Sequence, residues 1–380
     1  MRYSVNRYDC SRKIMVITNM GCNLNCIYCY EHHKEKQTVF NPDETANELC
    51  QVLRTKKPKG TLIKLLGGEP FLVFPNIKKL CESIWAEKDL DNVLFHATSN
   101  GTLVHGEIKE WLWTNRNRFT VKLSLDGNKQ AHDINRPSSF DKIDIDFFKV
   151  AWPDVGIKMT MSPQNIHLFA DSIIFLHQTG FKTIKPNLAE FVDWNQRDLI
   201  KTFYRQMMLL VDFYLDNPQF TPCKYFTIPL RHIMESHTVF HNCTLGERDI
   251  YDYKTGKHYP CMFFLPEICG ERLSEEMLHL DMSRKENQVD GACCHCIFQN
   301  VCQTCYAANY MQRGSSAKRD MSICKMQQIT FLATSKLLYQ KYVVQGQNIP
   351  NTQKGYYIYK DIEAISNVVD KLHEIESEYE

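Results

Sequence analysis

The sequence lacks a net charge, because 45 Lys and Arg side chains stand against 44 Asp and Glu, which leaves +1. Without a basic excess, binding to nucleic acid is disfavoured. No apolar run approaches the ~18 residues that a membrane-spanning helix needs. The first six residues contain neither the apolar core nor the cleavage site of a signal peptide. These absences predict a cytoplasmic protein that does not enter a membrane.

Cysteine, in contrast, is plentiful, with 16 residues in a chain of 380. A chain of this length without a signal peptide can build its own hydrophobic core, so clustered thiols more often indicate metal than disulfides. Ten cysteines lie between Cys223 and Cys324, and three more lie between residues 22 and 29. We expect the other three to be ordinary small apolar residues: Cys10, Cys50 and Cys81.

The loop of residues 22–29 places Cys22, Cys26 and Cys29 at C-x3-C-x2-C spacing, after an apolar run at residues 14–17 that predicts a strand. Three thiolates can hold three irons of a cubane iron–sulfur cluster and leave the fourth iron open, whereas ferredoxin clusters use four cysteines. The alternative is a structural zinc site, for which His32 or His33 could supply the fourth ligand.

This loop, with the aromatic Tyr28 before its last cysteine, resembles the radical S-adenosylmethionine superfamily, and residues 26–31 are most similar to its peptide- and protein-modifying branch. The resemblance implies that the open iron binds the amino and carboxylate groups of S-adenosylmethionine. One-electron reduction then releases a 5′-deoxyadenosyl radical, which takes a hydrogen atom from the substrate. The implied cofactors are S-adenosylmethionine, a 4Fe–4S radical cluster and two auxiliary 4Fe–4S clusters.

Short apolar runs alternate with amphipathic stretches up to about residue 190, which predicts a parallel α/β fold. The predicted strands are residues 15–18, 62–66, 93–98, 120–125, 157–161 and 183–188. Six units fit the partial (β/α)6 TIM-type barrel of the family, with the site at the C-terminal strand ends. We expect this barrel in residues 1–220, a cysteine-rich SPASM-like iron–sulfur domain in residues 221–335 and a helical tail in residues 336–380.

Several polar motifs follow these strands. Gly67-Gly68-Glu69 would allow close backbone approach and offer a carboxylate to the methionyl amine, and Ser99 closes the next strand. By resemblance, Ser124 and Arg136 contact the ribose and the carboxylate of S-adenosylmethionine, and an arginine fork suits a carboxylate. Plain strand-to-helix turns and a surface ion pair between Arg136 and Asp133 are the alternatives. The expected cofactor-binding residues are Tyr28, Gly67, Gly68, Glu69, Ser99, Ser124, Arg136 and Leu188.

The C-terminal cysteines resemble a SPASM extension, and the alternative is a pair of zinc knuckles. The family pairing implies a first auxiliary cluster on Cys243, Cys261 and Cys305, with Cys223 as a candidate fourth ligand. Two residues separate Cys302 from Cys305 where the family has three, which weakens the assignment of Cys305. The second auxiliary cluster would be held by Cys293, Cys296, Cys302 and Cys324.

In sulfatase maturases, the cysteine that corresponds to Cys261 is followed by an aspartate that acts as a base. Here that position is Met262, which cannot act as a base. The general base is therefore unknown, with Asp249, Asp252 or His258 as substitutes. We expect a peptide maturase that installs a crosslink, an oxidation or an inversion. The alternatives are a formylglycine-forming sulfatase maturase and a noncatalytic zinc-binding interaction module.

The expected partners are a peptide or protein substrate and a reductant such as flavodoxin or ferredoxin. Residues 1–21 are too short for the leader-binding module of the family, so a separate leader-binding protein is a further expected partner. Apolar residues at helical spacing in residues 354–380 predict one closing amphipathic helix.

Overall fold

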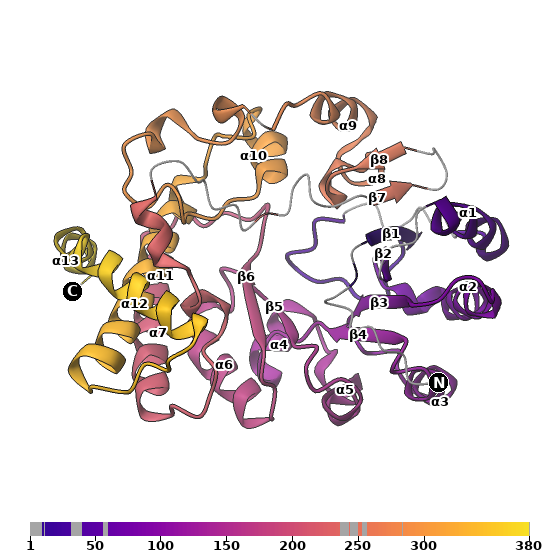
Figure 1. The fold of residues 1–380 in the computed structure, drawn as a ribbon, viewed down its shortest axis with the longest axis horizontal. Coiled ribbons are helices and arrows are strands. Elements are labelled where there is room, and N and C mark those ends of the chain that lie inside the picture. Colours follow the sequence, from indigo (N-terminus) through magenta and orange to yellow (C-terminus); the bar gives the residue numbers. More distant parts are fainter. Residues whose placement is uncertain are drawn as a thin grey trace. The chain divides into compact units, whose positions relative to one another are not determined.

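The computed structural model describes residues 10, 12–31, 40–55, 60–235, 243, 250–252, 257–282 and 284–379 (Figure 1). The chain divides into two compact units. Unit 1 comprises Met1–Leu125, His132–Lys158 and Leu245–Leu278. Unit 2 comprises Asp126–Ala131, Met159–Thr244 and His279–Glu380.

Unit 1 is built on a four-stranded parallel sheet in the order β1-β2-β3-β4. Its strands are β1 (Arg12–Asn19), β2 (Thr61–Gly67), β3 (Val93–Ser99) and β4 (Phe119–Leu123). The helices of this unit are α1 (Pro42–Thr55), α2 (Phe74–Ala86), α3 (Gly106–Thr114), α5 (Ile145–Ala151), α8 (Pro266–Cys269) and α9 (Glu271–Leu278). Figure 1 shows α1, α2 and α3 along the same side of the sheet.

The two faces of this sheet differ because successive strand residues point to opposite sides. On the helix-covered face, Phe95 and Phe119 stack with their ring centroids 6.2 Å apart, and each also meets a tryptophan ring edge-on, Trp85 of α2 and Trp111 of α3 respectively. Phe95 and Phe119 are fully buried there. The intervening positions form the other face, which carries Lys64, His96 and Lys122 as well as apolar side chains such as Leu94, and the candidate site lies on this face.

Unit 2 contains most of the remaining helices. Helix α4 (Lys129–Asn135) and strand β5 (Ile157–Met161) cross the boundary between the units, and β5 forms a two-stranded sheet with β6 (Ile184–Leu188). The helices are α6 (Phe169–Gln178), α7 (Arg197–Asp216), α10 (Tyr306–Arg313), α11 (Met321–Tyr339), α12 (Gln353–Ser366) and α13 (Val369–Ser377). Helices α7 and α11 pack along each other, and a buried cluster that includes Phe298, Phe331 and Leu372 joins the cysteine-rich segment to the C-terminal helices.

All six apolar runs coincide with strands, so the α/β prediction is confirmed. The described strands form separate four-stranded and two-stranded sheets, and a parallel bridge joins Ser124 to Lys158 at the start of β5. The sheet is not closed, and the partial barrel stays a prediction. None of the helices in the described part of the chain is long and apolar enough to cross a bilayer.

One local prediction needs correction, and one element was not predicted. The single helix expected over residues 354–380 is wrong, because the chain forms α12 and α13 with a break at Asn367 and Val368. The Asn367 side chain donates to the Glu363 carbonyl at 2.8 Å, and such side-chain bonds compete with helix continuation. The sequence also gave no sign of an antiparallel hairpin between β7 (Ile250–Asp252) and β8 (Lys257–Tyr259), whose strands are three residues each.

Candidate functional site

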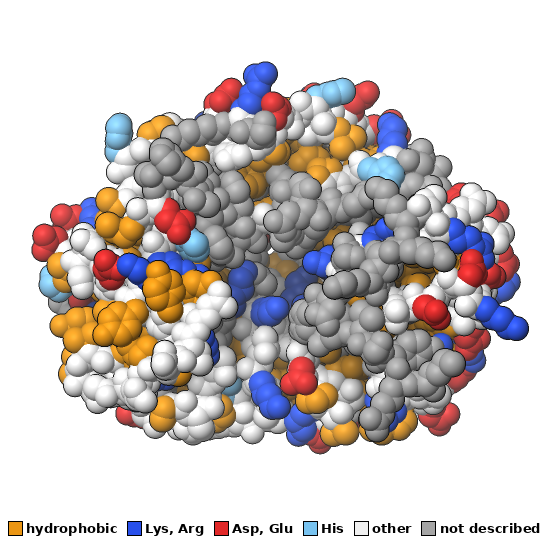
Figure 2. All heavy atoms as spheres, in the orientation of Figure 1, with side chains coloured by type: hydrophobic (Ala, Val, Ile, Leu, Met, Phe, Trp, Pro, Cys, Tyr) orange, Lys and Arg blue, Asp and Glu red, His pale blue; other side chains and the backbone are white. Residues whose placement is uncertain are grey.

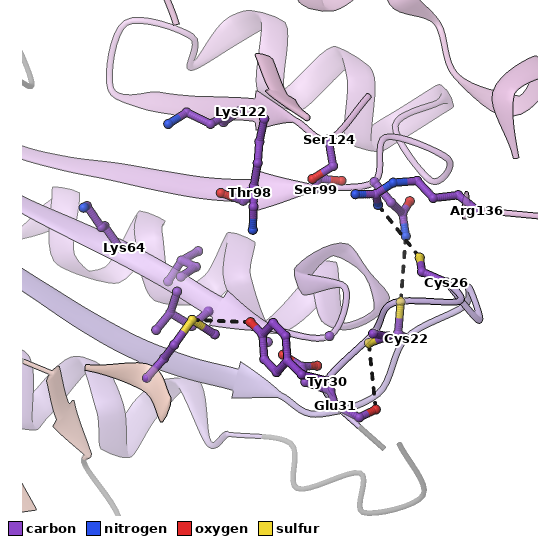
Figure 3. A pocket seen from close by; sticks show the side chains of 18 of the residues that line it. Cys22, Cys26, Tyr30, Glu31, Lys64, Thr98, Ser99, Lys122, Ser124 and Arg136 are labelled. Atoms are coloured by element: carbon purple, nitrogen blue, oxygen red, sulfur yellow. Dashed lines mark hydrogen bonds between the residues drawn. The ribbon is translucent and has the colours of Figure 1, made fainter. Parts of the chain in front are cut away.

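A cavity of about 370 Å³ lies in unit 1 on the polar face of the sheet. Its lining includes all three cysteines of the opening motif and side chains from the C-terminal ends of β2, β3 and β4 (Figure 3). Residues more than a hundred positions apart in the chain therefore meet at one site. This is the edge of a parallel sheet at which α/β enzymes generally bind their ligands.

The cysteine loop is fixed by hydrogen bonds rather than by regular secondary structure. The Ile27 N–H donates to the Asn135 carbonyl at 3.0 Å, and the Cys29 N–H donates to the Cys26 carbonyl at 3.1 Å. Asn100 attaches the loop to β3, since its amide donates to the Asn23 side chain at 2.9 Å and reaches Cys22 Sγ at 4.0 Å. Residues 99–101, which the sequence allowed to be a plain turn, thus help to position the first thiol.

Gly67 and Gly68 allow the backbone at the end of β2 to lie in close contact with the loop that follows β1. A Cβ on Gly67 would lie 2.3 Å from the Asn19 carbonyl oxygen, and one on Gly68 would lie 2.3 Å from that of Gly21. The Glu69 N–H donates to the same Gly21 carbonyl at 2.9 Å. Only glycine fits this approach, and both glycines line the cavity.

Glu69 is fully buried, and its carboxylate links the end of β2 to the end of β3 through hydrogen bonds. Its Oε1 accepts from the Ser99 hydroxyl at 2.9 Å and from the Phe71 N–H at 3.1 Å, and its Oε2 accepts from the Asn100 N–H at 2.8 Å. Burial raises the pKa of Glu69 to about 6, against the opposing effect of these donors and of Arg136. Among the described residues, Ser99 lines the cavity and Glu69 does not.

Arg136 and Ser124 also line the cavity. Arg136 is 7% exposed, its Nη1 lies 4.0 Å from Cys26 Sγ, and its guanidinium carbon lies 5.5 Å from the centre of the Tyr28 ring. The Asp133 carboxylate accepts the backbone N–H groups of Ser139 and Phe140. Arg136 is therefore a buried residue of the cavity wall, and Ser124 lines the same cavity.

Met262 also lines this cavity, and its sulfur accepts a hydrogen bond from the Tyr30 hydroxyl at 3.4 Å. A thioether thus occupies the position after Cys261. His258 lies on β8, whereas Asp249 and the side chain of Asp252 lie outside the described residues, as do His32 and His33.

Sequence reasoning missed a set of basic side chains in the cavity: Lys64 of β2, His96 of β3, Lys122 of β4 and Lys158 of β5. The signal was present, because each stands at an alternate strand position where an inward apolar residue is usual. The His96 Nδ1 lies 2.9 Å from the Thr120 hydroxyl, across the β3–β4 pair.

Four C-terminal thiols gather in unit 2. Burial raises the pKa of Cys302 and of Cys324, and the neighbouring thiols of Cys293 and Cys296 raise both further. Arg319 is 7% exposed and its Nη1 lies 3.3 Å from Cys302 Sγ. Burial and neighbouring thiols favour the protonated form, whereas this cation favours the thiolate that an iron cluster requires.

The cysteines predicted to hold the first auxiliary cluster do not all belong to one unit. Cys261 belongs to unit 1, whereas Cys243 and Cys305 belong to unit 2. Cys223 is 1% exposed and burial raises its pKa to about 12, so its thiol is held in the neutral form. Leu188 ends β6 in unit 2. The first auxiliary ligand set and the contact of Leu188 with adenine stay predictions.

The donor chemistry of the cavity fits a thiolate-bound cluster beside a small polar cofactor. In the described part of the chain, no three His, Cys, Asp or Glu side chains are close enough to hold a single metal ion. A cubane differs from a single tetrahedral ion because its thiolates bind separate irons, and so they stand farther apart. Arg136 and Asn100 direct N–H donors at Cys26 and Cys22, which suits thiolates.

Two sequence relatives place the chain among known proteins. An uncharacterized protein of Methanocaldococcus jannaschii is 27% identical over 185 residues, which is 47% of this chain and 62% of that protein. The chain therefore spans less than two thirds of this relative. A cysteine-type anaerobic sulfatase-maturating enzyme of Clostridium perfringens is 22% identical over 270 residues, which is 64% of this chain and 72% of that enzyme.

Two solved structures share the fold. The anaerobic sulfatase-maturating enzyme anSMEcpe with bound AdoMet matches with a TM-score of 0.65 at 20% identity, over 84% of this chain and 96% of the other. Streptococcus suis SuiB bound to its precursor peptide SuiA matches with a TM-score of 0.54 at 16% identity, over 82% and 75%.

Residues 16–145 match the radical SAM superfamily, whose members bind S-adenosylmethionine and a 4Fe–4S cluster. This range runs from β1 to the start of α5 and so contains the cysteine loop, the two glycines, Ser124 and Arg136. The sequence relatives, the shared fold and the cysteine-lined cavity agree with this match. The chain therefore carries, at residues 16–145, a radical S-adenosylmethionine domain.

Proposed function

We propose that this protein is a radical S-adenosylmethionine maturase that modifies a residue of a ribosomally made peptide by crosslinking, oxidation or inversion. The observation that carries the proposal is the convergence of Cys22, Cys26 and Cys29 on one cavity with Gly68 and Arg136. Two fold relatives were solved with peptides, SuiB with SuiA and anSMEcpe with a Cys-containing peptide, which supports a peptide substrate.

In this proposal Cys22, Cys26 and Cys29 hold the radical cluster. When bound, the cluster and S-adenosylmethionine supply a carbon radical that can take a hydrogen atom from an unactivated C–H bond. Arg136 would orient the cofactor carboxylate through two parallel hydrogen bonds from its planar guanidinium group. Glu69 would hold Ser99 and Asn100 in place, and these two residues would contact the cofactor. The remaining proposed cofactor contacts are Tyr28, Gly67, Gly68, Ser124 and Leu188.

The C-terminal cysteines would hold two auxiliary 4Fe–4S clusters, as predicted from the sequence. The four thiols beside Arg319 suit the second of these clusters. We assign the first to Cys243, Cys261 and Cys305, with Cys223 as the candidate fourth ligand. These clusters would accept an electron from a substrate radical or bind the substrate directly.

The wider arrangement is also proposed. The radical domain would adopt a partial (β/α)6 barrel within residues 1–220, followed by the SPASM-like region at 221–335 and the tail at 336–380. A flavodoxin or ferredoxin would reduce the radical cluster, and a separate protein would deliver the peptide leader.

Formylglycine formation is the second candidate, because a sulfatase-maturating enzyme is among the sequence relatives. Met262 disfavours it, since the thioether that lines the cavity cannot remove a proton from a substrate thiol or hydroxyl. We therefore expect little turnover of a short Cys- or Ser-containing sulfatase peptide, and efficient formylglycine formation would promote this candidate.

The decisive experiment measures 5′-deoxyadenosine after chemical reduction of the anaerobically purified protein with S-adenosylmethionine. The wild type should contain iron and acid-labile sulfide and form 5′-deoxyadenosine, and Cys26→Ala should not form it. Cys50→Ala, a buried change in α1, is the matched control. Zinc without sulfide in the wild type would instead identify the interaction module. With the precursor peptide, deuterium at the attacked carbon should pass into 5′-deoxyadenosine.

A further inference from the structure

A second cavity, of about 690 Å³, lies within unit 2 between α12 and the 3-10 helix η5 (Leu230–Met234), which pack against each other. One wall is formed by η5 and Glu235, and the other by α12 and its C-terminal cap. The wall residues of α12 and its cap are Tyr356, Tyr357, Lys360, Glu363 and Asn367. Figure 2 shows hydrophobic side chains gathered over the part of this face where α12 lies in Figure 1.

The wall of this cavity runs along α12, because its residues recur every three or four positions and so follow one face of the helix. Tyr356 and Asn367 are eleven positions apart, which at 1.5 Å per residue is about 16 Å. A peptide in the polyproline II conformation rises about 3.1 Å per residue, so about five of its residues span this length. The wall therefore matches a short extended segment.

The charged side chains of the cavity have their counterparts in the wall or directly beside it. The pairs are Arg231 with Asp361 at 3.3 Å, Lys360 with Glu363 at 2.7 Å and His232 with Glu235 at 2.8 Å. A charged ligand would have to compete with these pairs, so charge complementarity favours an uncharged one. An amphipathic helix needs a broad apolar groove, which a wall with ion pairs along it does not offer.

One tyrosine of the cavity is held in place before any ligand binds. The guanidinium carbon of Arg231 lies 4.3 Å from the centre of the Tyr357 ring, and the Arg231 N–H donates to Asp361 Oδ1 at 2.7 Å. The Tyr357 hydroxyl accepts a hydrogen bond from Gln353 Nε2 at 2.8 Å. Asp361 itself is buried. A ring that is fixed in this way loses little conformational freedom on binding, which favours affinity.

The apolar surface of the cavity is exposed. Tyr356 is 59% exposed, its ring centre lies 6.0 Å from that of Tyr357, and Met234 is exposed on the opposite wall. Among the described residues, the Tyr356 hydroxyl has no hydrogen-bond partner. Tyrosine offers a flat apolar ring together with a polar hydroxyl. Proline in an extended segment is the matching ligand, because its ring is apolar and uncharged and the carbonyls of a polyproline II chain make no internal hydrogen bonds.

We propose that the cavity between η5 and α12 docks an uncharged, proline-containing extended segment of the peptide substrate, with Tyr356, Tyr357 and Met234 as its contacts. This inference rests on the proposed function, which makes the substrate a peptide. Aromatic-lined grooves recognise such segments because the polyproline II conformation is formed in advance and costs little entropy on binding. The radical cavity is lined by residues of unit 1, so the docked segment is a different part of the peptide from the modified residue.

The test compares two blocked octapeptides without charged residues, each with a neutral fluorophore, one with proline at every second position and one with alanine there. Binding is measured by fluorescence anisotropy on the reconstituted full chain. We expect the wild type to bind the proline peptide roughly tenfold more tightly. Tyr356→Ala should abolish this preference. Tyr356→Phe, which keeps the ring and loses the hydroxyl, should retain part of it, and Met234→Ala should reduce it.

Tyr359→Ala is the matched control, because Tyr359 is a 68% exposed tyrosine of the same helix that does not line the cavity. This variant should keep the wild-type preference. Equal binding of the two peptides by the wild type, or an unchanged preference in Tyr356→Ala, would overturn the proposal. Sedimentation of the wild type as a dimer that Tyr356→Ala dissociates would overturn it in favour of a second copy of the chain. Formation of 5′-deoxyadenosine on reduction is recorded in the same samples, and its absence in the wild type would contradict the proposed function instead.

Discussion

The Nη1 atom of Arg136 lies 4.0 Å from Cys26 Sγ, which joins the end of α4 to the cysteine loop. Arg136→Lys keeps the charge and loses the planar fork, so we expect weaker binding of S-adenosylmethionine with unchanged iron content. Loss of a charge-assisted hydrogen bond costs roughly 1.5–3 kcal/mol, or about ten- to a hundredfold in affinity. Equilibrium dialysis of the reconstituted protein measures this.

The control for Arg136 is Arg272→Lys, because the Arg272 side chain is 79% exposed and pairs with Glu276 on the surface of the same unit. An Arg136→Lys variant with wild-type affinity would remove this residue from the cofactor site.

Gly68→Ala should prevent assembly of the radical cluster. The new Cβ would lie 2.3 Å from the Gly21 carbonyl oxygen and 3.0 Å from Cys22 Cβ, and a backbone clash cannot be relieved by a rotamer change. The cysteine loop must therefore move, and we expect a loss of about four irons per chain. Iron analysis after anaerobic reconstitution measures the loss. Gly291→Ala, where a Cβ meets nothing within 4 Å, should retain full iron, and a fully loaded Gly68→Ala protein would show that the loop tolerates the shift.

Local patterns in the sequence predicted the strands and the cysteine loop because both are encoded by short periods and fixed spacings. The sequence also predicted that the backbone at Gly67-Gly68 makes a close contact, since paired glycines after a strand indicate one, although it did not identify Gly21 as the partner. The roles of Asn100 and Glu69 were not, because their partners lie on other strands and only the register brings them together.

The set of basic side chains in the unit 1 cavity escaped sequence reasoning for a related reason. A single lysine in a strand is ordinary, and only the pairing of Lys64 with His96, and of Lys122 with Thr98, shows that the charges share one face. Asn367 likewise looked compatible with a continuous helix until its side chain was seen to bond the Glu363 carbonyl. Strand pairing decided the first of these points, and a local side-chain hydrogen bond decided the second.

Arg319→Gln should weaken the binding of the second proposed auxiliary cluster and change its reduction potential. The buried guanidinium lies 3.3 Å from Cys302 Sγ, and its removal takes away the positive charge beside this thiolate. We expect a more negative reduction potential for one cluster, because positive charge near a cluster favours the reduced form. A redox titration followed by electron paramagnetic resonance measures this shift. Arg284→Gln, a side chain 65% exposed on the same unit, should leave all potentials unchanged, and an unshifted Arg319→Gln protein would move the cluster elsewhere.

The last prediction concerns Glu69, whose burial raises its pKa from 4.5 to about 6. Between these two values the folded protein holds the proton more tightly than the unfolded chain does. The stabilising contribution of this group is therefore complete below pH 4.5 and is lost as the pH rises through 6. The change is (6 − 4.5) × 1.36, or about 2 kcal/mol in the free energy of unfolding.

Glu69→Gln cannot titrate, so its free energy of unfolding should lack this change. The Gln amide N–H group also faces the N–H and O–H donors of Asn100 and Ser99, which should lower stability by about 1–3 kcal/mol at low pH. Urea denaturation of wild type and variant from pH 4.5 to 6.5 measures the difference, which should shrink as the pH rises. Glu110→Gln, an exposed change on α3, should run parallel to the wild type. A wild-type-to-Glu69→Gln difference that stays constant over this range would mean that Glu69 does not titrate there.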